Sequence, residues 1–159
     1  MPNYWLIKSE PGVYSIDDLK RDGKTYWDGV RNYQARNFLR DQMKPGDKAF
    51  FYHSNADPSG IAGICEAASE GYPDPSAFDP KDHHYDSKSA KDHPVWYVVD
   101  IQFVKKFRRL LPLEELRKIQ GLEKMALLKR GQRLSVQPVS AKEWRIISEF
   151  FERFENQEA

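Results

Sequence analysis

The amino-acid sequence predicts an α+β domain built on a small, strongly bent sheet or barrel with helices packed against it. Five segments have strand composition, and none is joined to the next by a regular strand–helix–strand alternation, which disfavours a doubly wound parallel sheet. The 159 residues are 40% hydrophobic and 13% aromatic, which is enough to bury the core of one domain. We expect this domain to span residues 1–155, with residues 156–159 as a frayed tail.

The first third of the chain predicts one strand and two helices. Residues 4–8 are aromatic and β-branched, as is typical of a strand. Ser15 and Asp18 have the spacing of a capping box and predict a short helix that stops near Gly23. Residues 33–43 place apolar side chains at helical spacing, so they predict a second helix.

The middle of the chain predicts two strands and a long loop. Residues 48–52 and 61–68 are strand candidates, and Cys65 in the second is expected to be a core residue. Residues 69–94 contain four prolines and six acidic against three basic residues, which predicts a loop. Because so long a loop in a compact domain is often functional, we expect a lid or a partner-binding surface there.

The last third predicts two strands and three helices. Residues 95–104 have the strongest strand composition, and a helix follows from Pro112, since proline suits a first helical turn. Residues 122–130 are expected to form a second short helix. Residues 134–139 alternate as a strand does, and the final helix is expected to run to about Arg153.

Charge and cysteine content limit the function classes. With 25 basic and 24 acidic residues the formal net charge is +1, so the chain cannot coat nucleic acid through overall charge, and any such binding must be local. The single cysteine excludes an intrachain disulfide and a cysteine-based zinc site. With no secretory signal and no long apolar run, we expect a cytoplasmic protein without a membrane partner.

A turn with a large aromatic residue is the strongest candidate for a binding site. Trp27 is followed by Gly29, Arg31 and Asn32, and Asn32 can cap the helix that begins there. Stacking surface beside hydrogen-bonding groups and a helix N-terminus suits a planar polar ligand. The alternative is that Trp27 fills the core and the remaining residues only form the turn.

Two further polar clusters lie at strand ends. Ser9 and Glu10 follow the first strand, and residues 52–55 end the second. If these ends meet the Trp27 turn, they form a pocket with an aromatic wall and neutral hydrogen-bonding edges. Since the sequence has neither a Gly-rich phosphate loop nor a nucleophile elbow, binding is favoured over catalysis.

Histidines in the long loop raise the question of a metal site. His83, His84 and His93 lie there, and imidazole is a common ligand for transition metals. Adjacent histidines point in different directions on most backbones, and the spacing of a zinc protease motif is absent. We therefore expect no metal and no cofactor.

Cations are concentrated between residues 105 and 133, where ten basic residues accompany three acidic ones. Such a group can hold a phosphate backbone, or it can be the solvated face of helices.

The segments 5–11 (WLIKSEP), 27–37 (WDGVRNYQARN) and 51–55 (FYHSN), with GxRxSVxPV at 131–139, resemble the EVE domain over nearly the whole chain. The resemblance implies a PUA-like fold, a bent β-barrel of about five or six strands flanked by helices. EVE domains are similar to YTH domains, whose aromatic pocket holds a methylated adenine of RNA. The resemblance therefore implies a non-enzymatic module that binds a modified base, either a modified cytosine in DNA or a modified base in RNA, and we expect a monomer.

Carried onto this sequence, the resemblance makes Trp27 the stacking wall of the base pocket, with Trp96 as a further aromatic. The expected pocket residues are Trp27, Asn32, Ser9, Glu10, Tyr52, His53, Ser54, Asn55, Gly29, Val30 and Trp96. The expected phosphate-binding residues are Arg31, Arg36, Lys105, Lys106, Arg130 and Arg133. Two alternatives stay open: a nuclease that uses His53, Glu10 or Lys8 for proton transfer, and a protein-interaction module that acts through residues 69–94.

Overall fold

The computed structural model describes the backbone of residues 3–130 and 134–157, and the side chains of residues 3–130 and 134–153. Part of the segment GxRxSVxPV, including Gly131 and Arg133, therefore lies outside the described residues. No helix in the described part of the chain has the length and apolar character needed to cross a bilayer.

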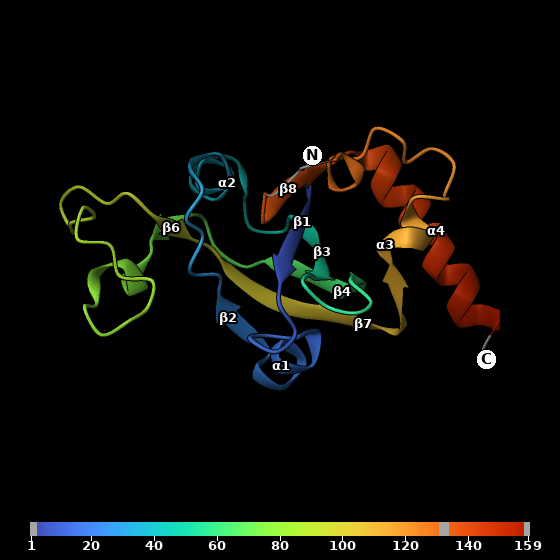
Figure 1. The fold of residues 1–159 in the computed structure, drawn as a ribbon, viewed down its shortest axis with the longest axis horizontal. Coiled ribbons are helices and arrows are strands. Elements are labelled where there is room, and N and C mark those ends of the chain that lie inside the picture. Colours follow the sequence, from blue (N-terminus) through green and yellow to red (C-terminus); the bar gives the residue numbers. More distant parts are fainter. Residues whose placement is uncertain (1–2, 131–133, 158–159) are drawn as a thin grey trace.

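A strongly curled sheet of six strands forms the centre of the molecule (Figure 1). Its strand order is β2-β7-β4-β3-β1-β8, in which β1 and β3 are parallel and the other neighbours antiparallel. The strands are β1 (Tyr4–Ser9), β2 (Lys24–Tyr26), β3 (Lys48–His53), β4 (Gly60–Ala67), β7 (Asp100–Pro112) and β8 (Val136–Val139). Register shifts along β4 on both sides bend the sheet into a half-barrel, because each extra residue increases the local twist. The α+β class and the bent sheet are thus confirmed.

Helices and helical turns cover the sheet and its ends. They are α1 (Ile16–Asp22), α2 (Tyr33–Asn37), the π-helical turn η1 (Phe38–Gln42), the 3-10 turns η2 (Pro75–Phe78) and η3 (Ala126–Leu128), α3 (Leu113–Leu116) and α4 (Ala141–Gln157). The predicted capping box of α1 is confirmed, since the Ser15 hydroxyl accepts from the Asp18 amide and the Asp18 carboxylate accepts from the Ser15 amide. Asn32 caps α2 by accepting from the Ala35 amide.

Two predicted elements in the second half of the chain need correction. The strand predicted at 95–104 pairs in the main sheet only from Asp100, and it continues to Pro112 because β4 offers partners along its whole length, the last being Gly60 opposite Pro112. The preceding residues pair separately, as β6 (Tyr97–Val98) with β5 (Tyr72–Pro73). Of the helix predicted at 122–130, only the 3-10 turn η3 forms. A segment of this length adds too few helical hydrogen bonds to offset the cost of starting an α-helix.

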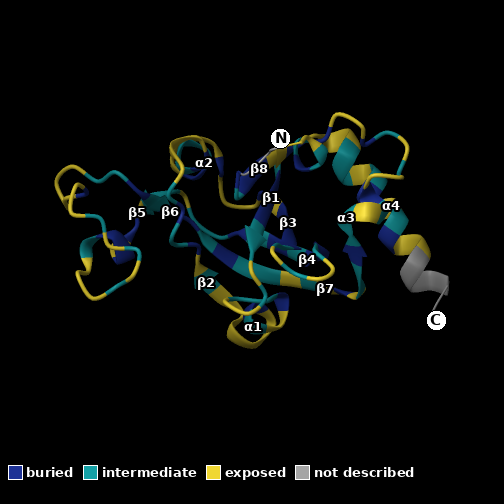
Figure 2. Ribbon diagram, in the orientation of Figure 1, coloured by how far each residue is buried: buried dark blue, intermediate teal, exposed yellow. Residues whose placement is uncertain are grey.

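Two apolar clusters fill the two faces of the sheet. Successive side chains of a strand point to opposite faces, so Ile7 joins the cluster beneath α1 and α2, whereas Leu6 joins the one beneath α4. Trp27 belongs to the first cluster and Tyr52 to the second. Figure 2 shows the buried strands between the more exposed helices and loops.

The long loop predicted at 69–94 forms a lobe that projects from the end of the sheet (Figure 1, left). We call residues 69–96 the lobe. Apart from β5 and η2 it consists of turns, many of them closed by Asp side chains that accept hydrogen bonds from backbone amides two residues later. These local bonds order a segment that has little regular structure.

Candidate functional site

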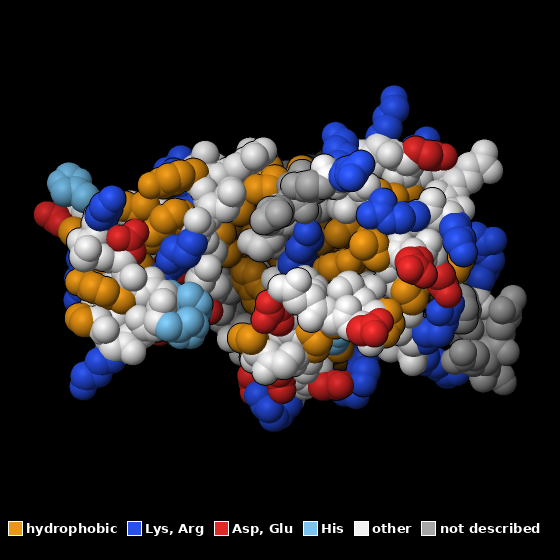
Figure 3. All heavy atoms as spheres, in the orientation of Figure 1, with side chains coloured by type: hydrophobic (Ala, Val, Ile, Leu, Met, Phe, Trp, Pro, Cys, Tyr) orange, Lys and Arg blue, Asp and Glu red, His pale blue; other side chains and the backbone are white. Residues whose placement is uncertain are grey.

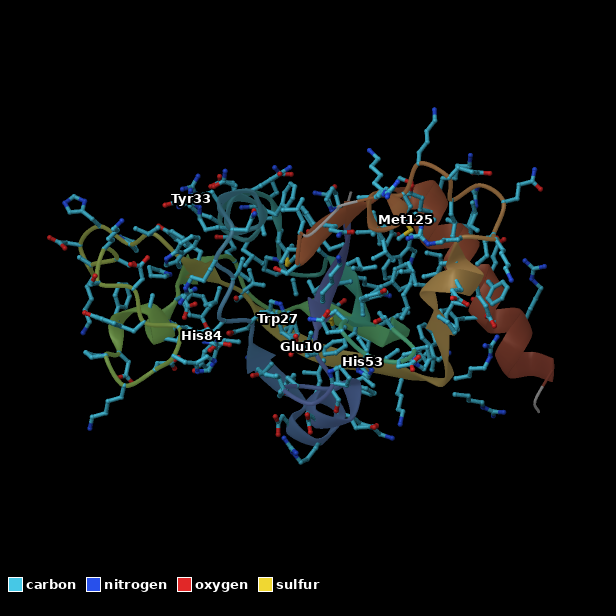
Figure 4. All side chains as sticks on the ribbon, viewed as in Figure 1. Glu10, Trp27, Tyr33, His53, His84 and Met125 are labelled. Carbon is cyan, nitrogen blue, oxygen red and sulfur yellow. The ribbon has the colours of Figure 1, made fainter. Side chains whose placement is uncertain are left out.

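A cavity of about 330 Å³ lies where the lobe meets the sheet. Its size falls within the range of about 300 to 1,000 Å³ that is typical of small-molecule sites. In Figure 3 histidine side chains border a hollow between the lobe and the rest of the molecule, and Figure 4 places Trp27 beside His84 of the lobe. The lining residues are Lys8, Ser9, Val13, Tyr14, Thr25, Tyr26, Trp27, Asp28, Gly29, Val30, His83, His84 and Ser135.

Trp27 forms a fixed wall of this cavity. Its side chain is 8% exposed, and edge-to-face contacts hold its ring against Phe51, at 5.5 Å between centroids, and Tyr14, at 6.3 Å. Its amide donates to the carbonyl of Val99, which continues the pairing of β2 with β7. Trp27 is therefore both a core residue and a cavity residue, so the two interpretations of its sequence context are compatible.

The lobe packs against the turn that follows Trp27. Gly29 has a φ of +76°, and a Cβ built there would lie 2.5 Å from Nε2 of His84. The imidazole ring of His84 thus packs directly on the backbone of the turn, which only glycine permits. Because of this contact, His84 of the lobe lines the cavity.

A buried ion pair anchors the lobe to the same turn. The side chain of Asp74 is 0% exposed, and its Oδ2 accepts from Nη1 of Arg31 and from the amide of Gly29, at 3.0 and 3.1 Å. Burial alone would raise the pKa of Asp74, but hydrogen bonds from Ser76, Arg31 and Gly29 outweigh it and lower the pKa. Nη2 of Arg31 also donates to the carbonyl of His84 at 2.6 Å. Arg31 therefore binds the lobe at two points.

The cavity contains one carboxylate and one ammonium side chain, Asp28 and Lys8. Burial raises the pKa of Asp28 and lowers that of Lys8. Oδ2 of Asp28 lies 3.6 Å from Nδ1 of His84. A ligand with hydrogen-bond donors on a planar edge can thus be bound by Asp28 while its face lies on an aromatic ring.

Four of the eleven predicted pocket residues line the cavity: Ser9, Trp27, Gly29 and Val30. Asn32 lies outside it because its side chain caps α2. His53 lies outside too, since its Nε2 accepts from the amide of Ile16 at 3.1 Å, and burial lowers its pKa.

The remaining predicted pocket residues also lie elsewhere. Glu10 and Asn55 bond to each other, with 2.6 Å between Oε1 and Nδ2. Neither Tyr52, whose side chain faces α4, nor Ser54 lines the cavity. Trp96 ends the lobe. Its Nε1 donates to Asp86 of the lobe at 2.7 Å, and its ring stacks on Tyr33 of α2.

The predicted phosphate-binding residues have separate surroundings. Arg31 and Arg36 are engaged within the protein, since Nη1 of Arg36 donates to the carbonyl of Val95 at 2.6 Å and its guanidinium lies over Tyr33. Nζ of Lys106 pairs with Asp17 at 2.7 Å. The ammonium group of Lys105 lies over Phe107 on the side of α4. Arg130 is exposed, and Arg133 is outside the described residues.

Sequence reasoning missed nine residues of the lining. Asp28 lies inside the turn that the sequence singled out, and its place beside Trp27 was a usable signal. His83 and His84 were considered only as metal ligands, because nothing in the sequence shows that the lobe folds back on the turn. The others are Lys8, Val13, Tyr14, Thr25, Tyr26 and Ser135.

Comparisons with known proteins give one consistent result. The family model described as "EVE domain" matches residues 3–150. The chain is 49% identical to thymocyte nuclear protein 1 of Gallus gallus over 89% of this chain and 65% of that protein. It is 48% identical to thymocyte nuclear protein 1 of Homo sapiens over 91% of this chain and 72% of that protein. The chain thus spans about two thirds to three quarters of these relatives.

Solved structures agree in fold. A Pseudomonas syringae protein superposes with a TM-score of 0.90 and 49% identity, covering 93% of this chain and 99% of that one. Human THYN1, crystallised in complex with 5-methylcytosine-containing DNA, superposes with a TM-score of 0.86 and 46% identity, covering 94% of this chain and 98% of that one. The fold of the present chain is therefore the fold of these proteins.

The names of the relatives contradict the expected cytoplasmic location, because they describe nuclear proteins. The expectation rested on a single cysteine and the lack of a secretory signal. Thiols are kept reduced in the nucleus as well as in the cytosol, so cysteine content cannot separate these two compartments.

Proposed function

The chain belongs to the EVE domain family, and we propose that it is a non-enzymatic reader of a modified base, with 5-methylcytosine in DNA as the first candidate. One observation carries the proposal: the cavity of about 330 Å³ is walled by Trp27 in a chain that is 46% identical to a human protein crystallised with DNA containing that base. Trp27 directly follows β2 of the six-stranded sheet, and its amide donates to the carbonyl of Val99.

In this proposal the base stacks on Trp27 and presents its polar edge to Asp28. The exocyclic amine of cytosine is a hydrogen-bond donor, and the carboxylate of Asp28 is an acceptor that lines the cavity. Val30 and Thr25 supply apolar surface for a methyl group. Asn32 supports the site by capping α2 and does not contact the base, because its side chain is already bonded to the amide of Ala35.

The energies set the expected selectivity. Stacking on an aromatic side chain contributes about 1 to 3 kcal/mol per base. A single methyl group in a fitted pocket contributes about 1 to 3 kcal/mol, or roughly 10- to 200-fold in discrimination. A base in a duplex must also leave its stack at a cost of a few kcal/mol. We therefore expect moderate selectivity for the modified base and tighter binding when the base is unpaired.

We propose no catalytic role. The nuclease alternative would use His53, Glu10 or Lys8. His53 and Glu10 are bonded to Ile16 and Asn55 and lie outside the cavity, so Lys8 lines the cavity without either of them. Incubation with labelled DNA and RNA should leave both uncut, and cleavage that is lost in His53→Gln would overturn this part of the proposal.

The test compares two oligonucleotides that differ only in one methyl group on a cytosine, each as single strand and as duplex, with an RNA version as a further arm. In fluorescence anisotropy the wild type should prefer the methylated strand by about 10-fold or more. Trp27→Phe should weaken binding and Asp28→Asn should reduce the preference. Tyr33→Ala is the matched control, because that aromatic side chain is 62% exposed and does not line the cavity.

Because Trp27 is part of the core, removing it also costs stability. A buried Trp→Ala change costs about 3 to 5 kcal/mol, so binding by the variants must be measured well below their melting temperatures. A folded Trp27→Ala protein that keeps the wild-type preference for the methylated strand would refute the assignment of the pocket.

A further inference from the structure

Two histidines and an aspartate of the lobe converge at the edge of the cavity. One ligand atom from each of Asp82, His83 and His84 lies within 4.8 Å of the other two. The ring centroids of His83 and His84 are 3.8 Å apart, so these adjacent side chains point the same way. The reason for setting a metal site aside on the sequence, that adjacent histidines diverge, therefore does not apply to this pair.

Two separations in this cluster are close to those between the ligands of a small tetrahedral ion. Oδ1 of Asp82 lies 3.3 Å from Nδ1 of His84 and 3.6 Å from Nδ1 of His83. Ligand bonds of about 2.0 to 2.2 Å at tetrahedral angles place neighbouring ligand atoms about 3.3 to 3.5 Å apart. The two distances to Asp82 are thus close to those of a bound site, and the ligand atoms of the two histidines, which lie within 4.8 Å of each other, complete it by a side-chain movement.

A second observation points to a ligand at the same place. Nδ1 of His84 is buried and has no hydrogen-bond partner among the described residues, although the carboxylates of Asp82 and Asp28 lie 3.3 and 3.6 Å away. A buried polar atom without a partner is costly, and binding an ion would satisfy it. The ring cannot turn freely to find another partner, because its Nε2 side packs on Gly29.

The backbone of the site is held in place before any ion binds. The amide of His84 donates to Oδ1 of Asp82 at 2.8 Å, and its carbonyl accepts from Arg31 at 2.6 Å. Arg31 in turn pairs with the buried Asp74. The order that these bonds impose lowers the entropy cost of binding an ion.

We propose that Asp82, His83 and His84 bind a divalent transition-metal ion of the zinc type. Imidazole nitrogens with one carboxylate favour Zn²⁺, Ni²⁺ or Cu²⁺ over Mg²⁺ and Ca²⁺, which prefer oxygen ligands. Three protein ligands leave a fourth position for water or for a group of a molecule in the cavity, which His83 and His84 also line. Asp28 stands beside the site and adds negative charge.

The experiment uses the full chain without an affinity tag and titrates it with Zn²⁺ by calorimetry and with Co²⁺ by visible absorption. We expect one ion per chain and cobalt bands of a tetrahedral site, and no binding of Mg²⁺. Loss of an outer partner of a metal ligand typically weakens affinity by about 10- to 100-fold, so loss of a ligand should weaken it at least tenfold.

Three variants locate the ion. His83→Ala should weaken Zn²⁺ binding at least tenfold with an unchanged melting temperature, because the His83 side chain is 81% exposed. Asp82→Asn should act likewise, and its amide oxygen still accepts the bond from the His84 amide. His93→Ala, an exposed histidine of the same lobe, is the matched control and should bind as the wild type does.

Two outcomes overturn the proposal. The first is a wild-type chain that takes up no Zn²⁺ at millimolar concentration, which would mean that Asp82, His83 and His84 do not form a metal site. The second is an affinity that falls as much in His93→Ala as in His83→Ala. Since these measurements use the metal alone, their result is independent of whether the chain reads a modified base.

Discussion

Replacing Arg31 by alanine should destabilise the protein without removing a contact to DNA. The pair with Asp74 joins atoms 3.0 Å apart, and the side chains are 25% and 0% exposed. Removing one partner of a buried pair costs about 3 to 5 kcal/mol, and we expect the lower end because Asp74 keeps its bonds from Gly29 and Ser76. At about 2 to 4 °C per kcal/mol, a loss of about 3 kcal/mol lowers the melting temperature by roughly 6 to 12 °C.

Thermal denaturation and the salt dependence of DNA binding separate this structural role from phosphate contact. A lost phosphate contact reduces the slope of log K against log salt by about 1. Arg31→Ala should keep the wild-type slope. Arg130→Ala, at an exposed arginine of the cationic segment, is the comparison and should leave the melting temperature unchanged. An Arg31→Ala protein with a wild-type melting temperature and a reduced slope would refute the structural role.

Three further predictions follow from the backbone and from buried groups. Gly29→Ala should lower the free energy of unfolding by about 1 to 3 kcal/mol and weaken DNA binding, because the φ of Gly29 is +76° and a Cβ there would meet His84. Gly12→Ala is the control and should change neither quantity, because the space around Gly12 is open. Urea denaturation measures the stability and fluorescence anisotropy the binding. Burial lowers the pKa of His53, so the unfolded chain takes up the proton first as pH falls. The free energy of unfolding should therefore fall as pH drops below about 6.5. Denaturation curves at several pH values should show a weaker pH dependence in His53→Gln, and an unchanged pH dependence would contradict the prediction. Burial raises the pKa of the Cys65 thiol far above its usual range, so a thiol reagent at pH 8 should label Cys65 only when the protein is unfolded.

Features that depend on neighbours in the chain were predictable from the sequence. The capping box of α1 and the Asn32 cap of α2 involve residues three positions apart, and the sequence shows both. The end of β7 was not predictable, because it depends on how far β4 extends beside it.

The site was less accessible to prediction than the fold, since its contacts join residues far apart in the chain. Arg31 resembles a free cation in the sequence, but its partner Asp74 is 43 positions away. Likewise, His84 approaches the turn at Gly29 only because the lobe folds back. Trp27 was identified from the turn that follows it and from the resembling segment, and the structure adds that it borders a cavity.

The most direct test of the base pocket uses the indole N–H signals of the four tryptophans in a nitrogen-edited NMR spectrum. Signals are assigned by single Trp→Phe changes, and a short DNA strand with one 5-methylcytosine is then added. The signal of Trp27 should move most, while that of Trp144, which belongs to α4 and stacks on Phe50, should stay in place. A Trp27 signal that is unmoved at saturating DNA, with shifts at Trp144 instead, would contradict the account.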